Sequence, residues 1–134
     1  MTTIIENLWP EFELEILTLS PKRILLEQAS FLMQATKNIL EADVTTFSHN
    51  NGEIDHNFFL IAPQLDGYRY NLLFIRQNGL MMYPCTLFFK NQGFLIETEG
   101  ILLQELKRIF SEQHTKNIVS SLLAQSKDNK SSVN

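Results

Sequence analysis

Three short apolar segments between residues 57 and 90 constrain the fold more than any other feature of the chain. They span residues 58–61, 72–75 and 87–89, and the turn dipeptides Asp66-Gly67 and Asn78-Gly79 separate them. Each segment is too short for a helix and is bounded by turn residues, so the pattern predicts antiparallel strands. A sheet with one solvated face alternates apolar and polar residues, whereas these segments are apolar at successive positions. This favours a sheet that is covered on both faces, and therefore a partner.

Strand patterns occupy five segments in series, namely residues 42–48, 54–62, 68–77, 80–90 and 94–97. Asn78-Gly79 predicts a two-residue hairpin turn that pairs Gln77 with Leu80 and Ile75 with Met82, because both turn positions require positive φ. In this register one face is the core face and carries Tyr70, Leu72, Phe74, Tyr83, Cys85 and Leu87. The opposite, mixed face carries Arg69, Asn71, Leu73, Ile75, Met82, Pro84, Thr86 and Phe88.

The mixed face is the candidate binding surface of this sequence. The partner-binding residues that we predict there are Arg69, Leu73, Ile75, Met82 and Phe88. Apolar patches of this kind mark interaction sites, methionine adapts to different surfaces, and arginine is enriched at binding hot spots. Two structural alternatives remain open. Residues 1–20 would cover the patch, or Arg69 would pack its aliphatic stem on Phe88 and leave its charge in water.

Helix signals flank the strands on both sides. Ser20 is a suitable N-cap and Pro21 suits the first helical position, so we expect a long helix over residues 21–41. Its apolar arc is broader than a helix on an open sheet requires, which indicates a second covering element, either the C-terminal helices or a second subunit. Two further helices are predicted, one over residues 99–111 with Thr98 as its N-cap and one over residues 115–126. The fold class is therefore α+β, with a long N-terminal helix, an antiparallel meander of four or five strands and two C-terminal helices packed on the sheet.

A chain of 134 residues fits one domain, which we assign to residues 1–126, and the polar residues 127–134 are expected to be a disordered tail. Residues 1–20 are ambiguous. Phe12, Leu14 and Ile16 alternate with glutamates as in a strand, so this segment is an edge strand or an extended arm. Such an arm would either pack on its own core or dock on a second subunit.

Charge and composition exclude several classes of function. The chain has 11 basic and 15 acidic residues and a net charge of −4, which argues against nucleic-acid binding and against an anionic membrane surface. It has no apolar run of membrane-spanning length and no basic group followed by an apolar signal-peptide core. A single cysteine excludes an intrachain disulfide. These features predict a cytoplasmic protein.

The sequence offers no assembled catalytic, cofactor or metal site. His49, His56 and His114 lack the spacing of metal ligands, and Asp55 and His56 are adjacent in a strand, so their side chains should point to opposite faces. Cys85 is predicted to be an inert buried thiol. The five glycines are isolated, which excludes a glycine-rich phosphate loop. We therefore expect a protein that is not an enzyme and that needs no cofactor and no metal.

The leading functional hypothesis is a non-enzymatic protein-binding module, such as an immunity protein, an antitoxin or a complex subunit, that binds another protein or itself as a homodimer. Two alternatives remain. In size, charge and helix–sheet composition the chain is similar to the small acidic chaperones of bacterial secretion systems, which implies a chaperone-like dimer. The second alternative is a small-molecule-binding protein or enzyme with a pocket between the sheet and the long helix, lined by His56, Tyr70, Tyr83 and Cys85.

Overall fold

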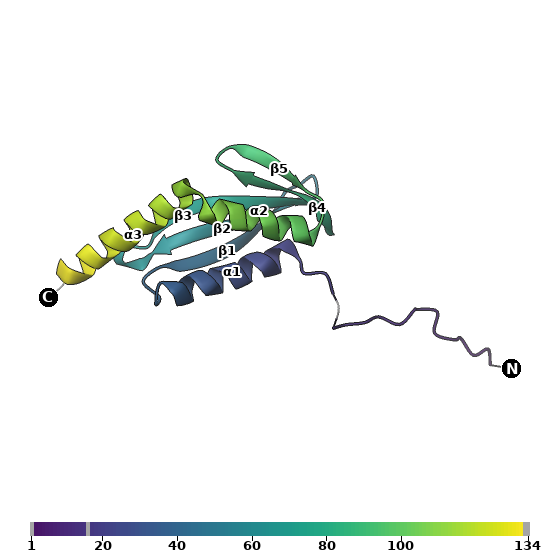
Figure 1. Cartoon of the computed structure of the whole chain (residues 1–134). Helices are drawn as coiled ribbons and strands as arrows, with labels where there is room; N and C mark the ends of the chain where they lie inside the picture. Colours follow the sequence, from purple (N-terminus) through teal and green to yellow (C-terminus); the bar gives the residue numbers. More distant parts are fainter. Residues whose placement is uncertain (1, 16, 133–134) are drawn as a thin grey trace.

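The computed structural model describes residues 2–15 and 17–132, and within these ranges the chain forms one sheet covered on one face by helices (Figure 1). The helices are α1 (Pro21–Ala35), α2 (Glu99–Ser111) and α3 (Gln113–Ser132), with a short 3-10 turn η1 (Pro63–Leu65). The strands are β1 (Glu41–Ser48), β2 (Glu53–Ala62), β3 (Tyr68–Asn78), β4 (Met81–Phe89) and β5 (Gln92–Ile96). They follow one another as an antiparallel meander in the order β1-β2-β3-β4-β5. The predicted α+β architecture is confirmed.

The N-caps predicted for the first two helices are both present, and each is a side-chain hydroxyl. Ser20 Oγ accepts a hydrogen bond from the Arg23 N–H at 3.1 Å, with Pro21 in the first turn of α1. Thr98 Oγ1 does the same for the Ile101 N–H at 3.3 Å at the start of α2. Each cap satisfies a backbone donor that the helix itself leaves unpaired. No helix within the described ranges is long and apolar enough to cross a membrane.

Helix α1 ends at Ala35, earlier than the predicted end at residue 41. Lys37 and Asn38 have positive φ values of 51° and 63°, a conformation that cannot continue a right-handed helix. Thr36 stabilises this turn, because its hydroxyl oxygen lies 3.0 Å from the Leu32 carbonyl oxygen and 3.3 Å from the Leu40 nitrogen. The strand predicted over residues 42–48 is present as the edge strand β1, which begins one residue earlier, at Glu41.

Helix α3 is longer than predicted and continues to Ser132. The prediction that residues 127–134 form a disordered tail is therefore wrong as far as Ser132, and residues 133 and 134 lie outside the described ranges. One reason is a contact that the sequence pattern does not reveal. The Asn129 side-chain amide donates a hydrogen bond to the Gln64 carbonyl in η1 at 2.7 Å, which ties the end of α3 to the β2–β3 connection.

The hydrophobic core lies between the sheet and the three helices. Its most deeply buried members come from α1, α2 and every strand except β1, and include Ile24, Leu25, Phe58, Leu60, Leu73, Ile75, Leu87, Ile96, Leu102 and Ile109. The broad apolar arc predicted for α1 is only partly covered. Ile24, Leu25 and Ala29 are buried, whereas Leu26 and Phe31 are exposed.

Two irregularities in β3 and β4 decide which side chains face the helices. Phe58 pairs with Leu73 and Phe59 pairs with Asn71, so Leu72 is an extra residue in β3. This bulge changes the phase of the strand, because side chains otherwise alternate strictly between faces. As a result Leu72 and Leu73 are both buried. Successive apolar residues in this part of β3 reflect a bulge in a sheet with one helix-covered face.

The hairpin register between β3 and β4 also differs from the predicted one. Asn78 pairs with Met81, and the next pair is Gln77 with Cys85, which leaves residues 82–84 between the two pairs. Pro84 lacks the N–H that a regular ladder position would donate. The predicted pairing of Gln77 with Leu80 is therefore wrong, and Ile75 faces Leu87 instead of Met82.

The N-terminal arm, residues 2–19, contains no helix or strand in its described part and extends away from the sheet (Figure 1). One of the two predictions was an edge strand, which the described residues of the arm do not form; the other was an extended arm, and its docking stays a prediction. Large apolar side chains remain exposed along the arm, namely those of Ile4, Ile5, Leu8, Trp9, Phe12, Leu14, Leu17 and Leu19. Ile16, part of the predicted alternation, lies outside the described residues.

The arm joins the body at Leu19. The Leu19 N–H donates to Glu99 Oε2 at 3.1 Å, and the Leu19 carbonyl accepts a hydrogen bond from the Tyr83 hydroxyl at 2.9 Å. The described residues of the arm therefore do not cover the sheet of their own chain, which was one of the predicted alternatives.

Candidate functional site

The face of the sheet opposite the helices carries a continuous set of aromatic and charged side chains, which we call the open face. Strand pairing places Phe47 beside Asp55, Phe59 beside Asp43 and Asn71, Phe74 beside Phe88, and Thr86 beside Leu95. The aromatic and aliphatic members of the open face are Phe47, Phe59, Phe74, Phe88 and Leu95. Phe47 and Leu95 are 59% and 63% exposed, whereas the other three are half-buried against their neighbours.

The five predicted partner-binding residues divide between the two faces. Arg69 and Phe88 lie on the open face. Leu73 and Ile75 do not, since they are 2% and 0% exposed in the core beneath the helices, and their predicted place on the surface is wrong because of the bulge at Leu72. Met82 is half-buried and belongs to residues 82–84, which have no strand partner in β3. The open face therefore replaces the mixed face as the candidate surface.

A stacked aromatic pair forms the centre of the open face. The rings of Phe74 and Phe88 lie 4.6 Å apart, nearly parallel at 15°. The Arg76 guanidinium carbon lies 5.5 Å from the Phe74 ring centre and 5.4 Å from that of Phe88, within the range of a cation–π contact. Gly93 of β5 makes room for this arrangement, because a Cβ atom there would meet the Phe88 ring at 3.2 Å.

Asp55 fixes the orientation of Arg76. Arg76 Nε and a terminal guanidinium nitrogen donate to the two carboxylate oxygens of Asp55 at 2.8 and 3.0 Å, a bidentate geometry. These hydrogen bonds, with smaller help from His49, lower the pKa of Asp55 below its ordinary value, although burial of the carboxylate acts in the opposite direction. A planar guanidinium held at two points is a rigid platform, which suits recognition by shape.

A second cation–π pair lies toward the β1 side of the same face. The Arg69 guanidinium carbon lies 4.5 Å from the centre of the Phe59 ring, and one of its nitrogens lies 3.3 Å from an Asp43 carboxylate oxygen. The alternative in which Arg69 packs on Phe88 is wrong in its ring partner, because the hairpin register of the structure pairs Phe88 with Phe74, five residues away from Arg69. That alternative also left the charge of Arg69 in water, whereas the structure pairs its guanidinium with Asp43.

His49 belongs to this face and was not recognised from the sequence. It lies just after β1, where its Nε2 atom is 2.8 Å from Asp55 Oδ2, and its ring meets Phe47 edge-on at 4.9 Å. The short β1–β2 turn brings His49 and Asp55 together. A separation of six residues matches no sequence pattern that would have predicted this contact. A histidine–carboxylate pair can orient an imidazole for proton transfer, but no nucleophile among the described residues contacts this pair.

His56 faces the helices, so Asp55 and His56 diverge as predicted. His56 is 5% exposed, and its ring nitrogens lie 3.0 Å from Thr46 Oγ1 and 3.0 Å from Gln77 Oε1. Gln77 uses its amide nitrogen to donate to the Gly79 carbonyl, so its oxygen accepts from His56 Nε2–H. Burial lowers the pKa of His56, which keeps the ring neutral. This network is structural, because it joins β1, β2 and β3 through Thr46, His56 and Gln77.

Cys85 is buried beneath the helices at 3% exposure, which confirms that the thiol is enclosed. Burial raises its pKa to about 11, so the thiolate that a nucleophile or a metal ligand requires is disfavoured. The described residues contain no group of three or more histidine, cysteine or acidic side chains that could hold a metal ion.

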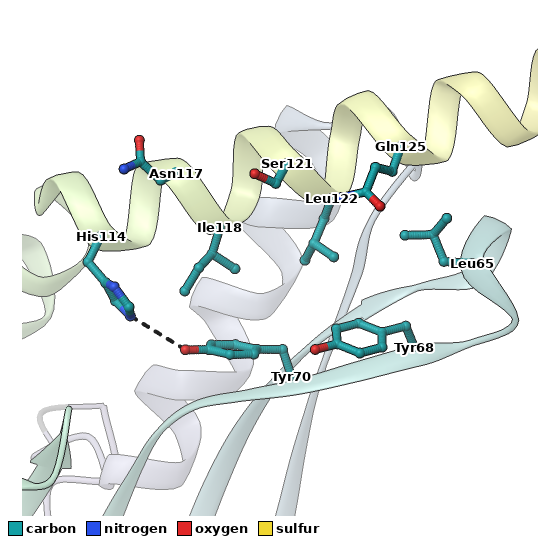
Figure 2. A pocket seen from close by; sticks show the side chains of 9 residues that line it. All are labelled: Leu65, Tyr68, Tyr70, His114, Asn117, Ile118, Ser121, Leu122 and Gln125. Atoms are coloured by element: carbon teal, nitrogen blue, oxygen red, sulfur yellow. Dashed lines mark hydrogen bonds between the residues drawn. The ribbon is translucent and has the colours of Figure 1, made fainter.

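Two hollows open on the helix side. The first, of about 570 Å³, lies between α3 and the start of β3, where Ile118 and Leu122 point toward Tyr68 and Tyr70 and His114 points to the Tyr70 hydroxyl (Figure 2). The Tyr70 hydroxyl lies 3.5 Å from His114 Nε2, at the outer limit of a hydrogen bond. Two apolar side chains and one histidine of α3 thus meet aromatic rings of β3 around one open cavity.

The second hollow, the α1–α3 groove, has a volume of about 490 Å³ and lies between these two helices above the sheet. Its apolar lining is formed by Phe31, Leu32, Phe58, Leu60, Phe110 and Val119. A pocket between the sheet and the long helix was one of our predictions, but the residues predicted to line it do not. Tyr70 lines the first hollow, and His56, Tyr83 and Cys85 line neither.

Comparisons with protein-family models, with curated proteins and with solved structures found no match to this chain.

Proposed function

We propose that this protein is a non-enzymatic binding module that uses the open face of its sheet to bind another protein. One observation carries the proposal. The three helices all cover one face, and no described segment crosses the other, where Phe47 and Leu95 are more than half exposed and the Phe74–Phe88 stack lies between them. Aromatic residues, phenylalanine among them, and arginine are enriched in the cores of protein interfaces.

The charges around the open face suggest the chemistry of the partner. Each of its two arginines is already paired with an aspartate, Arg69 with Asp43 and Arg76 with Asp55. Glu41 and Glu53 add further negative charge on the β1 and β2 side. We therefore expect a partner surface that is apolar at its centre and carries lysine or arginine at its rim, and the net charge of −4 would speed association with such a protein.

This proposal retains the classes named from the sequence, which are an immunity protein, an antitoxin or a subunit of a complex, in a cytoplasmic setting. The single cysteine is compatible with a reducing compartment. The bidentate Asp55–Arg76 pair supports a role in recognition, because it holds the guanidinium and the two rings in one geometry before any partner arrives.

The experiment is affinity capture and native mass spectrometry from the source organism with matched surface variants as bait. Phe47→Asp and Leu95→Asp alter exposed positions on the open face, and Leu103→Asp alters an exposed position on α2 as a control. We expect one basic partner that is retained by the wild type and by Leu103→Asp, is lost with both open-face variants and binds more weakly as salt is raised. Retention by all three variants would refute the proposal.

A second candidate function is the binding of a small molecule in the hollow of Figure 2. The observation in its favour is the approach of Tyr70 and His114 to each other at a cavity of about 570 Å³, a size common among ligand sites. Native mass spectrometry of the purified protein tests it. A stoichiometric bound compound that is lost in Tyr70→Phe and His114→Gln variants would support this function.

A further inference from the structure

We propose that the N-terminal arm docks into the α1–α3 groove of a second copy of the chain, so that two copies exchange arms. This inference does not depend on the proposed function of the open face, which lies on the opposite side of the sheet. It rests on two features that the single chain leaves unsatisfied, an exposed apolar arm and an empty apolar groove.

The arm has a pattern that suits a groove between two helices. Ile4, Ile5, Leu8 and Trp9 are all more than 75% exposed, and their spacing would place them on one side of a short helix. Thr3 and Glu6 have the spacing of a capping box at its start, and Pro10 would end it. A helix this short is unstable in water, which explains why the segment is extended when it is undocked. Amphipathic segments of this kind bind by inserting apolar anchors into a groove.

The groove offers matching chemistry. Its floor and walls are apolar, and its polar edge includes Gln28 and Lys116. The arm carries four glutamates and no lysine or arginine, so its charge complements Lys116. Thr115 also lines the groove, where its hydroxyl is buried and finds no hydrogen-bond partner among the described residues. A buried hydroxyl without a partner destabilises a fold, and a carbonyl or carboxylate of a docked arm would supply an acceptor.

The structure favours exchange between two copies over docking within one. The Tyr83 hydroxyl and the Glu99 carboxylate hold the Leu19 backbone, and from there the arm leads away from the body (Figure 1). In the single chain the groove therefore stays empty while the arm stays exposed. Reciprocal exchange fills two grooves and covers two arms for a single loss of translational and rotational freedom, which is the advantage of a symmetric interface.

The only tryptophan of the chain makes this inference directly measurable. Trp9 is 76% exposed in the arm, so its fluorescence should be red-shifted and readily quenched by acrylamide when the arm is free. We expect that raising the protein concentration shifts the emission to shorter wavelength and reduces quenching. Native mass spectrometry over the same concentrations should show the mass change from 15.5 kDa to twice that value.

Matched variants of the full chain separate this dimer from others. Phe31→Glu changes a groove residue that is 56% exposed, and Leu26→Glu changes a residue of the same helix that is 41% exposed and does not line the groove. Leu8→Asp changes the arm itself. We expect Phe31→Glu and Leu8→Asp to weaken dimerisation at least about tenfold and to keep Trp9 exposed, while Leu26→Glu behaves as the wild type. Circular dichroism confirms that each variant is folded.

Three outcomes would overturn the inference. The first is a wild type that stays monomeric with an exposed Trp9 at every concentration. The second is a protected Trp9 whose emission does not depend on concentration, which would mean that the arm docks on its own chain. The third is a dimer that Phe31→Glu and Leu8→Asp leave intact, which would place the interface elsewhere, for example on the open face.

Discussion

Both faces of the sheet carry phenylalanine side chains, but the exposure of these side chains differs between the two faces. Beneath the helices, Phe58, Leu73 and Ile75 are at most 2% exposed, and His56 has a hydrogen-bond partner for each ring nitrogen. On the open face, phenylalanine rings are stacked on one another or under guanidinium groups and remain partly in contact with water. The helix face therefore contributes most of the buried apolar area, and the partly exposed open face is the surface of the proposed binding function.

The largest expected effect is on the free energy of unfolding. It compares Leu73 and Phe74, which are adjacent in β3 and point to opposite faces of the sheet. Leu73→Ala leaves a cavity in the core and should lower the free energy of unfolding by about 2–5 kcal/mol. Phe74→Ala removes a larger side chain from the half-buried open face and should lower it by only about 1 kcal/mol. Urea unfolding followed by circular dichroism measures both. Equal losses would show that the two faces do not differ in this way.

The next effect concerns the two arginine–aspartate pairs of the open face. Asp55→Ala removes a carboxylate whose side chain is 11% exposed and which binds Arg76 twice, so we expect a loss of about 1–3 kcal/mol. Asp43→Ala removes one that is 47% exposed and should change stability by less than about 1 kcal/mol. Denaturation curves in low and high salt provide the comparison. If both variants lose the same stability, Asp55 is not a structural anchor of this face.

A smaller effect should appear as a pH dependence of the helix face. Burial lowers the pKa of His56 in the folded state below its ordinary value of 6.5. The unfolded chain therefore binds more protons than the folded chain at pH values just below 6.5. Stability should therefore fall as the pH decreases through this interval and level off below the lowered pKa. Thermal unfolding measured from pH 8 to pH 5 tests this. The dependence should be reduced in His56→Gln, and an unchanged slope in that variant would assign it to other groups.

The smallest expected effect sharpens the role of the Phe74–Phe88 stack. Gly93→Ala places a methyl group about where it meets the Phe88 ring, at 3.2 Å, so the ring must shift by a few tenths of an ångström. We expect a change in stability within about 1 kcal/mol, because the lower backbone entropy of alanine offsets part of the crowding. Gly100→Ala, where nothing lies closer than 3.9 Å, is the control. Aromatic NMR shifts of Phe74 and Phe88 should move in the first variant only.

Much of the fold could be predicted from local patterns, and much of the site could not. Ser20 and Thr98 mark helix starts through hydrogen bonds to residues three positions away, so the sequence alone locates them. The bulge at Leu72 has no comparable signal in the sequence, because leucine also occurs in regular strands. That one extra residue moves Leu73 and Ile75 from the predicted surface into the core. The His49–Asp55 contact and the α1–α3 groove likewise depend on how separate elements approach each other.

The sequence by itself determined the α+β class and the order of the elements, and it left the conformation of the arm open between two predictions. The class and the order follow from turn residues, caps and periodicity, which act over a few residues. Only the tertiary structure decided which sheet face is covered, which arginine meets which ring and where the hollows lie. A shift of one residue in a strand moves every following side chain to the other face, so small irregularities in β3 and β4 control the surface while leaving the fold unchanged.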